Sequence, residues 1–215
     1  MHQYKKQVDK EHYHSTYDSL ERFVSYYNQK KLVLEAIEKI DSHKSNIKIL
    51  EIGRGTGFLS SYLKSFDLNI KTLDIAADLK PDYVGNLLNA ESLPKEKFEI
   101  VCCFEVLEHI KFEDIGKALE NLKRLNDGYV IISVPQIRLY SSIWIKLPLL
   151  KSKGFSISLP FPLQHIFDGE HYWELGKKNY DRKKFKKLLQ ELFYIIDGFT
   201  HPLDPYHRFF VLTSK

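Results

Sequence analysis

The chain has 215 residues, of which 43% are hydrophobic and 28% charged, and its mixed charges sum to +4. This composition is ordinary for a globular protein and excludes a disordered chain, while the length favours one domain with a full core. The small, mixed charge gives no indication of a nucleic-acid partner, and no apolar run is long enough to span a bilayer.

The only two cysteines, Cys102 and Cys103, are adjacent within an apolar run. Neighbouring residues of a strand point to opposite faces, so these two thiols are not expected to pair. With no other cysteine in the chain, a disulfide framework and a zinc site built on cysteine spacing are both excluded. Unpaired thiols are typical of a reducing compartment, and we expect a cytoplasmic protein.

The N-terminal region, residues 1–46, is predicted to form an arm followed by a helical cap. Residues 1–10 are polar and lack the apolar core of a signal peptide. Residues 17–40 carry apolar side chains at helical spacing, which indicates one or two helices. Residues 41–46 are predicted to be a polar turn.

The next stretch is predicted to be a buried strand at 47–52, a glycine-rich turn and a helix at 58–66. In the turn, glycine occupies every second position from 53 to 57, and Glu51 stands two residues before the first. Glycine is needed where the backbone takes positive φ or approaches a ligand, and ligands of open α/β sheets bind at such turns. The spacing G-x-G-x-G differs from the G-x-G-x-x-G of dinucleotide sites, and the carboxylate favours a cation over a phosphate. A tight turn without a ligand is the alternative.

Two further strands are predicted to end in polar residues. Residues 69–73 form a strand that ends at Asp74, about 20 residues after the first glycine, which is the ribose-binding position of nucleotide-binding sheets. An ordinary surface aspartate is the alternative. Residues 82–85 form a third, short strand, which Asn86 and Asn89 follow.

The remaining regular elements complete an alternation of strands and helices. Residues 98–104 are nearly continuously apolar, as expected of a central parallel strand. After this fourth strand we expect an amphipathic helix, a fifth strand that stops at Pro135, a basic amphipathic helix and two final strands, at residues 112–125, 129–134, 181–192, 194–200 and 208–213.

The segment from residue 136 to residue 180 interrupts this alternation. It is rich in proline and aromatic residues, and a stretch of this length inside a compact domain is usually functional. We therefore expect a substrate lid. The alternative is an oligomer contact or a membrane-surface contact at residues 144–153, where apolar residues alternate with Lys146, Lys151 and Lys153.

The motifs of residues 47–134 resemble those of the class I S-adenosylmethionine (SAM)-dependent methyltransferases. The matching parts are Glu51-x-Gly53-x-Gly55-x-Gly57, Asp74 and Phe104-Glu105-Val106-Leu107-Glu108-His109. The resemblance implies an α/β, Rossmann-like fold with a seven-stranded, mostly parallel sheet, helices on both faces and an antiparallel last strand. It also implies a single domain over residues 1–215, SAM as the cofactor and S-adenosylhomocysteine as its product.

The resemblance further implies which residues surround the cofactor. In this family a helix before the glycine motif often closes over the cofactor, and an Asp or Asn after the third strand accepts the adenine amino group, for which we prefer Asn86 to Asn89. Arg54 replaces a small residue, and it either points to solvent, meets the cofactor carboxylate or crowds the pocket. The expected cofactor-binding residues are Glu51, Gly53, Arg54, Gly55, Gly57, Asp74, Ile75, Asn86, Leu87, Phe104 and Glu105.

Residues 169–174 resemble the His-x-Trp-Glu segment of ubiquinone-type O-methyltransferases, and small-RNA 2′-O-methyltransferases carry a comparable segment. In both groups a Glu-x-x-Glu-His run can hold a divalent metal. If a helix follows the fourth strand, the corresponding residues share one face of it. The alternative is that the first glutamate borders the cofactor while the other two residues brace the helix. The candidate metal ligands are Glu105, Glu108, His109 and, from the lid, His171.

The implied reaction is an in-line methyl transfer from SAM to a small-molecule acceptor, with O-methylation favoured. The protein aligns the reactants, and a base is needed only if the nucleophile starts protonated. His109 and His171 are the candidate catalytic bases, and a structural role is the alternative for each. A non-catalytic SAM- or nucleotide-binding protein, an RNA 2′-O-methyltransferase and an NAD-dependent enzyme on a similar sheet are the other functional classes.

Overall fold

A computed structural model describes residues 19–149, apart from 41–46, and residues 152–215, apart from 162 and 168. The expected N-terminal arm at residues 1–10 and the expected polar turn at residues 41–46 lie outside the described residues. Among the described residues, no helix combines the length and the apolar character needed to cross a membrane.

A seven-stranded sheet forms the centre of the structure, with the strand order β3-β2-β1-β4-β5-β9-β8. Strands β1 to β5 pair in parallel with their neighbours, whereas β9 pairs antiparallel with both β5 and β8. The predicted mostly parallel sheet with an antiparallel last strand is therefore confirmed. Its strands are β1 (Lys48–Ile52), β2 (Asn69–Asp74), β3 (Tyr83–Val84), β4 (Phe98–Phe104), β5 (Asn126–Pro135), β8 (Phe193–His201) and β9 (Asp204–Ser214).

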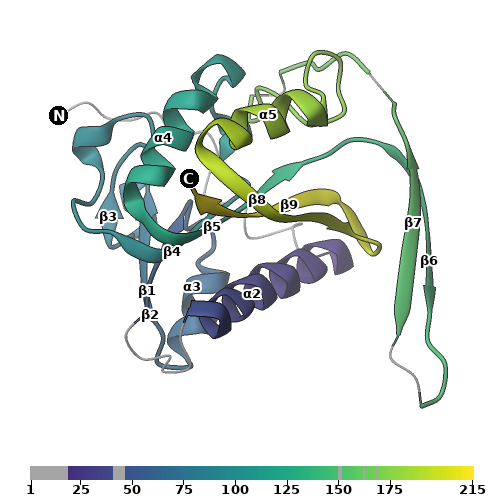
Figure 1. The fold of residues 1–215 in the computed structure, drawn as a ribbon, viewed down its shortest axis with the longest axis horizontal. Coiled ribbons are helices and arrows are strands. Elements are labelled where there is room, and N and C mark those ends of the chain that lie inside the picture. Colours follow the sequence, from purple (N-terminus) through teal and green to yellow (C-terminus); the bar gives the residue numbers. More distant parts are fainter. Residues whose placement is uncertain (1–18, 41–46, 150–151, 162, 168) are drawn as a thin grey trace.

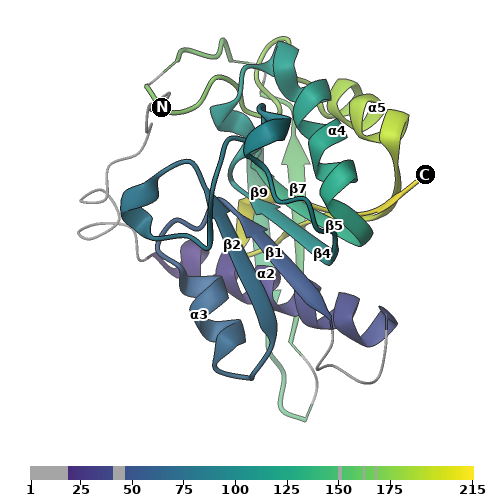
Figure 2. The ribbon, with the colours of Figure 1, turned by 90° about the vertical axis from the view of Figure 1, so that its left-hand side faces the viewer.

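Helices cover both faces of the sheet (Figures 1 and 2). Helices α2 (Leu20–Ile40) and α3 (Phe58–Lys64) pack on one face, and α4 (Ile115–Leu125) and α5 (Arg182–Leu192) pack on the other. Each face has its own apolar core, because successive residues of a buried strand alternate between the faces. Cys102 lies in one core and Cys103 in the other, and both are free, as expected.

Several element boundaries differ from the prediction, and the starts of three elements differ by three or four residues. Strand β9 begins at Asp204, four residues before its predicted start at Arg208. Strand β5 begins at Asn126, three residues before the predicted start at Tyr129, because Asn126 already pairs with Phe98 of β4. The Asn126 side chain bridges the irregular stretch that follows, since its amide donates to the Tyr129 carbonyl at 2.8 Å and its oxygen accepts the Gly128 amide at 3.2 Å. The helix expected from Phe112 begins as a short 3-10 turn and becomes α-helical only at Ile115.

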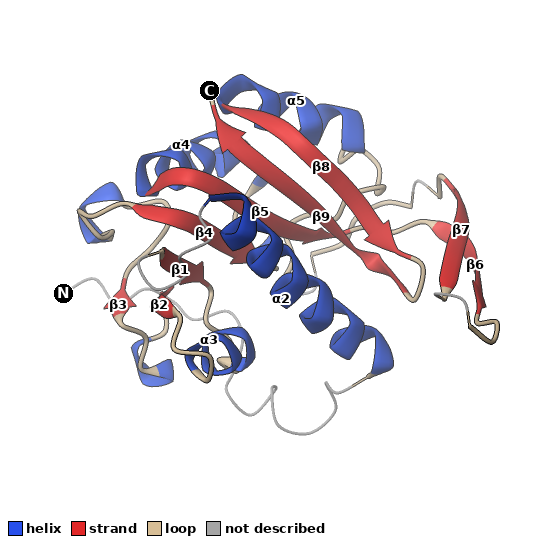
Figure 3. Ribbon diagram, turned by 60° about the horizontal axis from the view of Figure 1, so that its bottom comes forward, coloured by secondary structure: helices blue, strands red, loops and turns tan. Residues whose placement is uncertain are grey.

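The segment 136–180 contains an antiparallel hairpin, β6 (Leu139–Ile145) and β7 (Lys153–Leu159), that the sequence analysis did not predict. The hairpin stands apart from the seven-stranded sheet (Figures 1 and 3). The chain then returns to the sheet, where the Leu175 amide donates to the Pro135 carbonyl at 2.9 Å. Trp173 anchors this return, because its ring is fully buried and its Nε1 donates to the Ile110 carbonyl at 2.9 Å.

Candidate functional site

A cavity of about 500 Å³ opens at the carboxyl ends of β1, β2 and β4. This is the sheet edge where ligands of open α/β folds bind. Of the predicted cofactor-binding residues, only Gly57, the N-cap residue of helix α3, is absent from its lining. The predicted residues that line the cavity are Glu51, Gly53, Arg54, Gly55, Asp74, Ile75, Asn86, Leu87, Phe104 and Glu105.

The glycine turn has a backbone that only glycine adopts readily. Gly53, Gly55 and Gly57 have φ angles of +79°, +49° and +75°. At Gly53 there is also no room for a side chain, because an added Cβ would lie 2.3 Å from the Cγ2 atom of Val106. The turn therefore brings bare backbone against the residues that follow β4, at the wall of the cavity.

Arg54 does not point to solvent, which was the simplest of its three predicted placements. Its guanidinium lies beside Gly57 and donates a hydrogen bond to the carbonyl of Leu79, in the connection between β2 and β3. The side chain thus runs along the cavity wall. Because this hydrogen bond holds it there, Arg54 does not close the cavity, and it contributes a positive charge to the wall.

Glu51 is a buried carboxylate at the base of the cavity, with 5% of its surface exposed. Its Oε2 atom has no hydrogen-bond partner among the described residues. Burial raises the pKa of Glu51 to about 7, although Ser60 and Arg54 oppose this shift. An unpaired buried carboxylate oxygen is costly, and a cationic ligand group would satisfy it.

The buried Glu51 carboxyl makes the stability of the ligand-free protein depend on pH. Because the pKa of Glu51 is raised from 4.5 to about 7 in the folded protein, its carboxyl adds no cost to folding below pH 4.5, where it is protonated in both states. Folding becomes less favourable as the pH rises from 4.5 through about 7, because the buried group must then lose its proton. Across this range we expect the wild-type protein to lose about 3 kcal/mol of unfolding free energy relative to Glu51→Gln. Denaturant unfolding of both proteins at the two ends of the range measures this difference, and parallel pH profiles would contradict it.

Polar residues at the ends of β2 and β3 form the next part of the wall. Asp74 is 9% exposed, accepts the Ala76 amide at 2.8 Å, and has its pKa raised by burial. Asn86 lines the cavity, with its Oδ1 accepting the Leu88 amide at 2.8 Å. Asn89 instead accepts the Glu91 amide at the start of a 3-10 turn, away from the cavity lining. The structure thus places Asn86, the preferred candidate, at the cavity.

Helix α2 covers the cavity, as the resemblance implied. Its Arg22, Tyr26 and Gln29 line the space, and the Tyr26 ring stacks on the Phe58 ring with centroids 4.2 Å apart. Tyr26 thus packs against the first residue of α3, directly beside the glycine turn.

A buried chain of charged residues leads from the sheet to Glu105. Ser133 Oγ donates to Glu105 Oε1 at 2.7 Å, and His207 Nε2 lies 3.7 Å from Glu105 Oε2. The other ring nitrogen of His207 lies 2.7 Å from Oδ1 of the fully buried Asp204. Burial lowers the pKa of His207, but the Glu105 and Asp204 carboxylates outweigh burial and raise it overall. Asp204 and His207 were not predicted, because only the pairing of β9 with β5 brings them to this edge.

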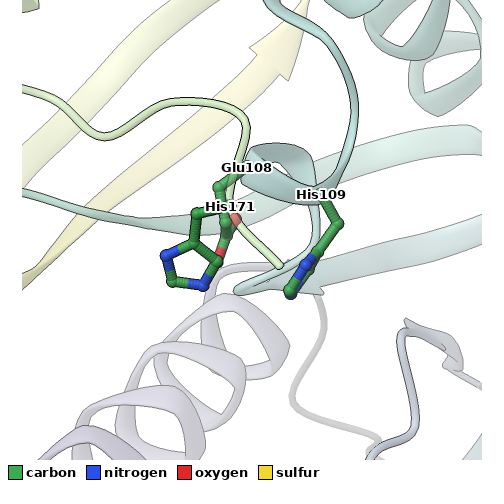
Figure 4. A group of neighbouring side chains, drawn as sticks. All are labelled: Glu108, His109 and His171. Atoms are coloured by element: carbon green, nitrogen blue, oxygen red, sulfur yellow. The ribbon is translucent and has the colours of Figure 1, made fainter. Parts of the chain in front are cut away.

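Glu108, His109 and His171 form a cluster beside the cavity, and each offers a ligand atom within 4.8 Å of the others (Figure 4). Glu108 is fully buried, and neither of its carboxylate oxygens has a hydrogen-bond partner among the described residues. Burial, followed by the nearby Glu105 carboxylate, raises the pKa of Glu108 well above its usual range. His109 lines the cavity, and its ring centroid lies 5.1 Å from that of His171.

The residues after β4 do not form the helix that was considered for Glu105, Glu108 and His109. They form a 3-10 turn over Leu107–His109, and Glu105 precedes it with a φ angle of +51°. Glu105 therefore points to Ser133 and lies outside the cluster, which corrects the idea of one shared helical face. His171 reaches the cluster because the Tyr172 amide donates to the Glu108 carbonyl at 2.8 Å.

Comparison with known proteins places the chain in a family. A family model described as a methyltransferase domain matches residues 20–191. The chain belongs to this family. The resemblance of its glycine turn and post-β4 motif to class I SAM-dependent methyltransferases is thereby confirmed.

One curated relative matches part of this methyltransferase domain. It is the mitochondrial ubiquinone biosynthesis O-methyltransferase of Candida albicans, which is 36% identical over 101 residues. The match covers 39% of this chain and 31% of that protein, so it spans under a third of the relative's length.

Solved structures of methyltransferases share the fold at low sequence identity. The glycopeptide N-methyltransferase MtfA, solved with S-adenosylhomocysteine, has a TM-score of 0.59 at 9% identity and covers 89% of this chain and 90% of its own. The magnesium protoporphyrin IX methyltransferase of Synechocystis PCC 6803 has a TM-score of 0.58 at 15% identity, with 94% and 91% covered. These similarities confirm the α/β class I methyltransferase fold.

Proposed function

We propose that the chain transfers a methyl group from SAM to a hydroxyl of a small-molecule acceptor. The observation that carries this proposal is the cavity itself, which has the unpaired Glu51 carboxylate at its base and the imidazole of His109 at its rim. The partial match to an O-methyltransferase supports hydroxyl as the acceptor group. SAM and S-adenosylhomocysteine are the ligands named for solved relatives of the same fold.

The residues of the cavity fit SAM. The unpaired oxygen of Glu51 suits the ammonium group, and the bare backbone of the glycine turn lets the ligand approach closely. Asp74, at the tip of β2, would accept hydrogen bonds from the ribose hydroxyls, and Asn86 and Leu87 would border the adenine. When bound, SAM supplies an electrophilic methyl group on a sulfonium sulfur.

His109 is the residue that accepts the acceptor's proton. Its Nδ1 lies 3.0 Å from the Glu170 carbonyl, and since a carbonyl only accepts, Nδ1 carries the hydrogen and Nε2 is the basic nitrogen. Burial lowers the pKa of His109, so the ring is neutral near pH 7 and able to take a proton. His171 packs against this ring and holds its orientation.

Calorimetric titration of SAM, S-adenosylhomocysteine and NADH into the protein tests the cofactor directly. We expect heat from the first two ligands and none from NADH. A screen of hydroxyl, amine and RNA acceptors with methyl-labelled SAM then tests the reaction. Binding of NADH alone would overturn the assignment, and SAM binding without transfer to any acceptor would identify a binding protein instead of an enzyme.

Asp74→Ala is expected to raise the SAM dissociation constant by about 10- to 100-fold, because it removes two hydrogen bonds to a charged acceptor. The protein should stay folded, since burial already raises the pKa of Asp74 and disfavours its charge. Asp74→Asn keeps one acceptor oxygen, so its SAM dissociation constant should lie between those of the wild-type protein and Asp74→Ala. An unchanged dissociation constant in Asp74→Ala would show that this carboxylate does not contact the ribose.

We also propose that Glu108, His109 and His171 can hold a divalent cation. Two buried carboxylate oxygens without partners on Glu108 fit a cation better than they fit an apolar surround. A cation bound at Nε2 of His109 would occupy the lone pair that otherwise takes the proton, so this site is an alternative to the base role, in which the cation lowers the pKa of an acceptor hydroxyl.

Chelation tests this cation site. We expect added Mn²⁺ or Zn²⁺ to raise the unfolding temperature of the chelated protein, because the cation relieves the buried Glu108 carboxyl. Glu108→Gln should abolish the rise. Full methyltransferase activity after exhaustive chelation, with no shift in unfolding temperature, would eliminate the cation and leave His109 as an unassisted base.

A further inference from the structure

One face of the β6–β7 hairpin is mostly apolar, with Ser141 and Lys153 as its two polar residues. In an antiparallel pair, directly opposite residues share a face, so the pairs 139–159, 141–157, 143–155 and 145–153 all lie on the same side. Six side chains on this side are apolar, and each is between 48% and 65% exposed. We call them the hairpin strip: Leu139, Ile143, Ile145, Phe155, Ile157 and Leu159.

The opposite face of the hairpin is turned toward the body of the protein. It carries three serines, Gly154 and the rings of Tyr140 and Trp144. Trp144 crosses over Gly154, where an added Cβ would lie 2.1 Å from the indole ring. Trp144 also contacts His201 with ring centroids 5.3 Å apart, at the turn between β8 and β9. The hairpin is therefore held by the face that carries Trp144, and the apolar strip faces outward.

The segment that carries the hairpin strip is basic. Residues 136–167 contain Arg138, Lys146, Lys151 and Lys153 and no Asp or Glu. Lys146 and Lys153 are exposed at the hairpin's end, next to Leu147 and Leu149, which are 53% and 105% exposed. Apolar side chains flanked by cations alone suit a surface with an apolar interior and anionic groups above it.

A second copy of the chain suits this surface less well. A two-fold contact pairs a surface with itself, so it would bring the basic residues of both hairpins together with no acid in residues 136–167 to offset them. Figures 1 and 3 show the hairpin at one side of the molecule, outside the seven-stranded sheet.

We propose that the β6–β7 hairpin docks the protein on anionic phospholipid bilayers, with the hairpin strip among the acyl chains and Lys146 and Lys153 at the head groups. The chain that follows β7 leads back to the cavity, where Tyr172 forms part of the lining. Docking therefore presents the rim of the cavity to molecules held at the bilayer surface.

Vesicle flotation with the full chain tests this proposal. The protein is expected to float with phosphatidylcholine vesicles that contain phosphatidylglycerol, to float less with phosphatidylcholine alone, and to be released as salt is raised. The double variant Phe155→Ser, Ile157→Ser should lower the partition coefficient by at least about 10-fold. Its matched control is Phe66→Ser, Ile196→Ser, which removes equally exposed apolar side chains elsewhere and should float normally.

A charge reversal tests the second half of the proposal. Lys146→Glu with Lys153→Glu should lower binding to the anionic vesicles by about 10-fold or more. Lys183→Glu with Lys187→Glu makes the same change of net charge on exposed positions of α5 and should have little effect. All four variants alter exposed side chains, so unchanged unfolding temperatures should show that each is folded.

Two outcomes would overturn the proposal. The first is wild-type protein that fails to float with anionic vesicles, or hairpin variants that float as well as wild type. The second is a concentration-dependent dimer in sedimentation velocity that Phe155→Ser, Ile157→Ser dissociates, without vesicle binding, which would assign the hairpin strip to a second copy of the chain.

Discussion

His109→Ala is expected to lower kcat for methylation of a hydroxyl acceptor by about 10²- to 10⁴-fold, the usual contribution of a positioned base. The SAM dissociation constant should stay nearly unchanged, because His109 is not among the residues assigned to the cofactor, most of which lie at the ends of β1, β2 and β3. Calorimetry and steady-state kinetics on the same preparation separate these two effects.

The choice of acceptor distinguishes a base from a structural brace. An acceptor whose hydroxyl is already ionised at the assay pH needs no proton removal, so His109→Ala should methylate it at nearly the wild-type rate. His171→Ala should lower kcat less than His109→Ala does, since His171 holds the ring and does not line the cavity. Equal losses for ionised and neutral acceptors would contradict a base and favour a structural role.

Gly53→Ala is expected to weaken SAM binding by about 10- to 100-fold. A non-glycine residue at a φ angle of +79° costs about 1–3 kcal/mol, and the new Cβ would lie 2.3 Å from Val106 Cγ2. The turn relieves the φ strain and the steric clash by moving its backbone. This movement changes the cavity wall that contacts the cofactor. Calorimetry measures the affinity for SAM, and thermal unfolding measures how much the substitution lowers the stability of the fold.

Two further variants locate the cause of the Gly53→Ala effect. Val106→Ala in the same chain removes the clashing methyl group and should restore part of the affinity, leaving the cost of positive φ. Gly116→Ala is the matched control, because nothing lies within 4 Å of the added Cβ in helix α4. This control should raise stability by about 0.5–1 kcal/mol and leave binding unchanged. Wild-type affinity in Gly53→Ala would show that the turn does not contact the cofactor.

Local patterns in the sequence predicted the elements that pack against the core. Strand β4 was predicted with its observed bounds, because a central strand is buried on both faces and must be apolar throughout. The glycine turn was predicted because positions with positive φ strongly favour glycine, so the repeated glycines are visible in the sequence. Apolar runs and glycine positions do not identify strands on the surface. Strands β6 and β7 were missed because their apolar residues face outward, and in the sequence they resemble the apolar residues of an irregular lid.

The candidate site also contains residues that the sequence predicted correctly and one that it did not. Residues next to the ends of consecutive strands, such as Glu51 and Asp74, were predicted because parallel strands deliver their carboxyl ends to one edge. The helical face proposed for Glu105 was wrong, because the chain takes a φ angle of +51° there and directs the carboxylate to Ser133. A single non-glycine residue at positive φ has no reliable signature in the sequence.

The sequence by itself determined the order of the strands and helices outside residues 136–180, the glycine turn and the residues at the tips of β1 and β2, because burial and backbone conformation constrain residue types locally. Only the tertiary structure decided which distant residues complete the site. The pairing of β9 with β5 brings Asp204 and His207 beneath Glu105, and the Tyr172–Glu108 hydrogen bond brings His171 to His109. These contacts depend on long-range pairing, and the residues that make them are of types equally common on a solvated surface.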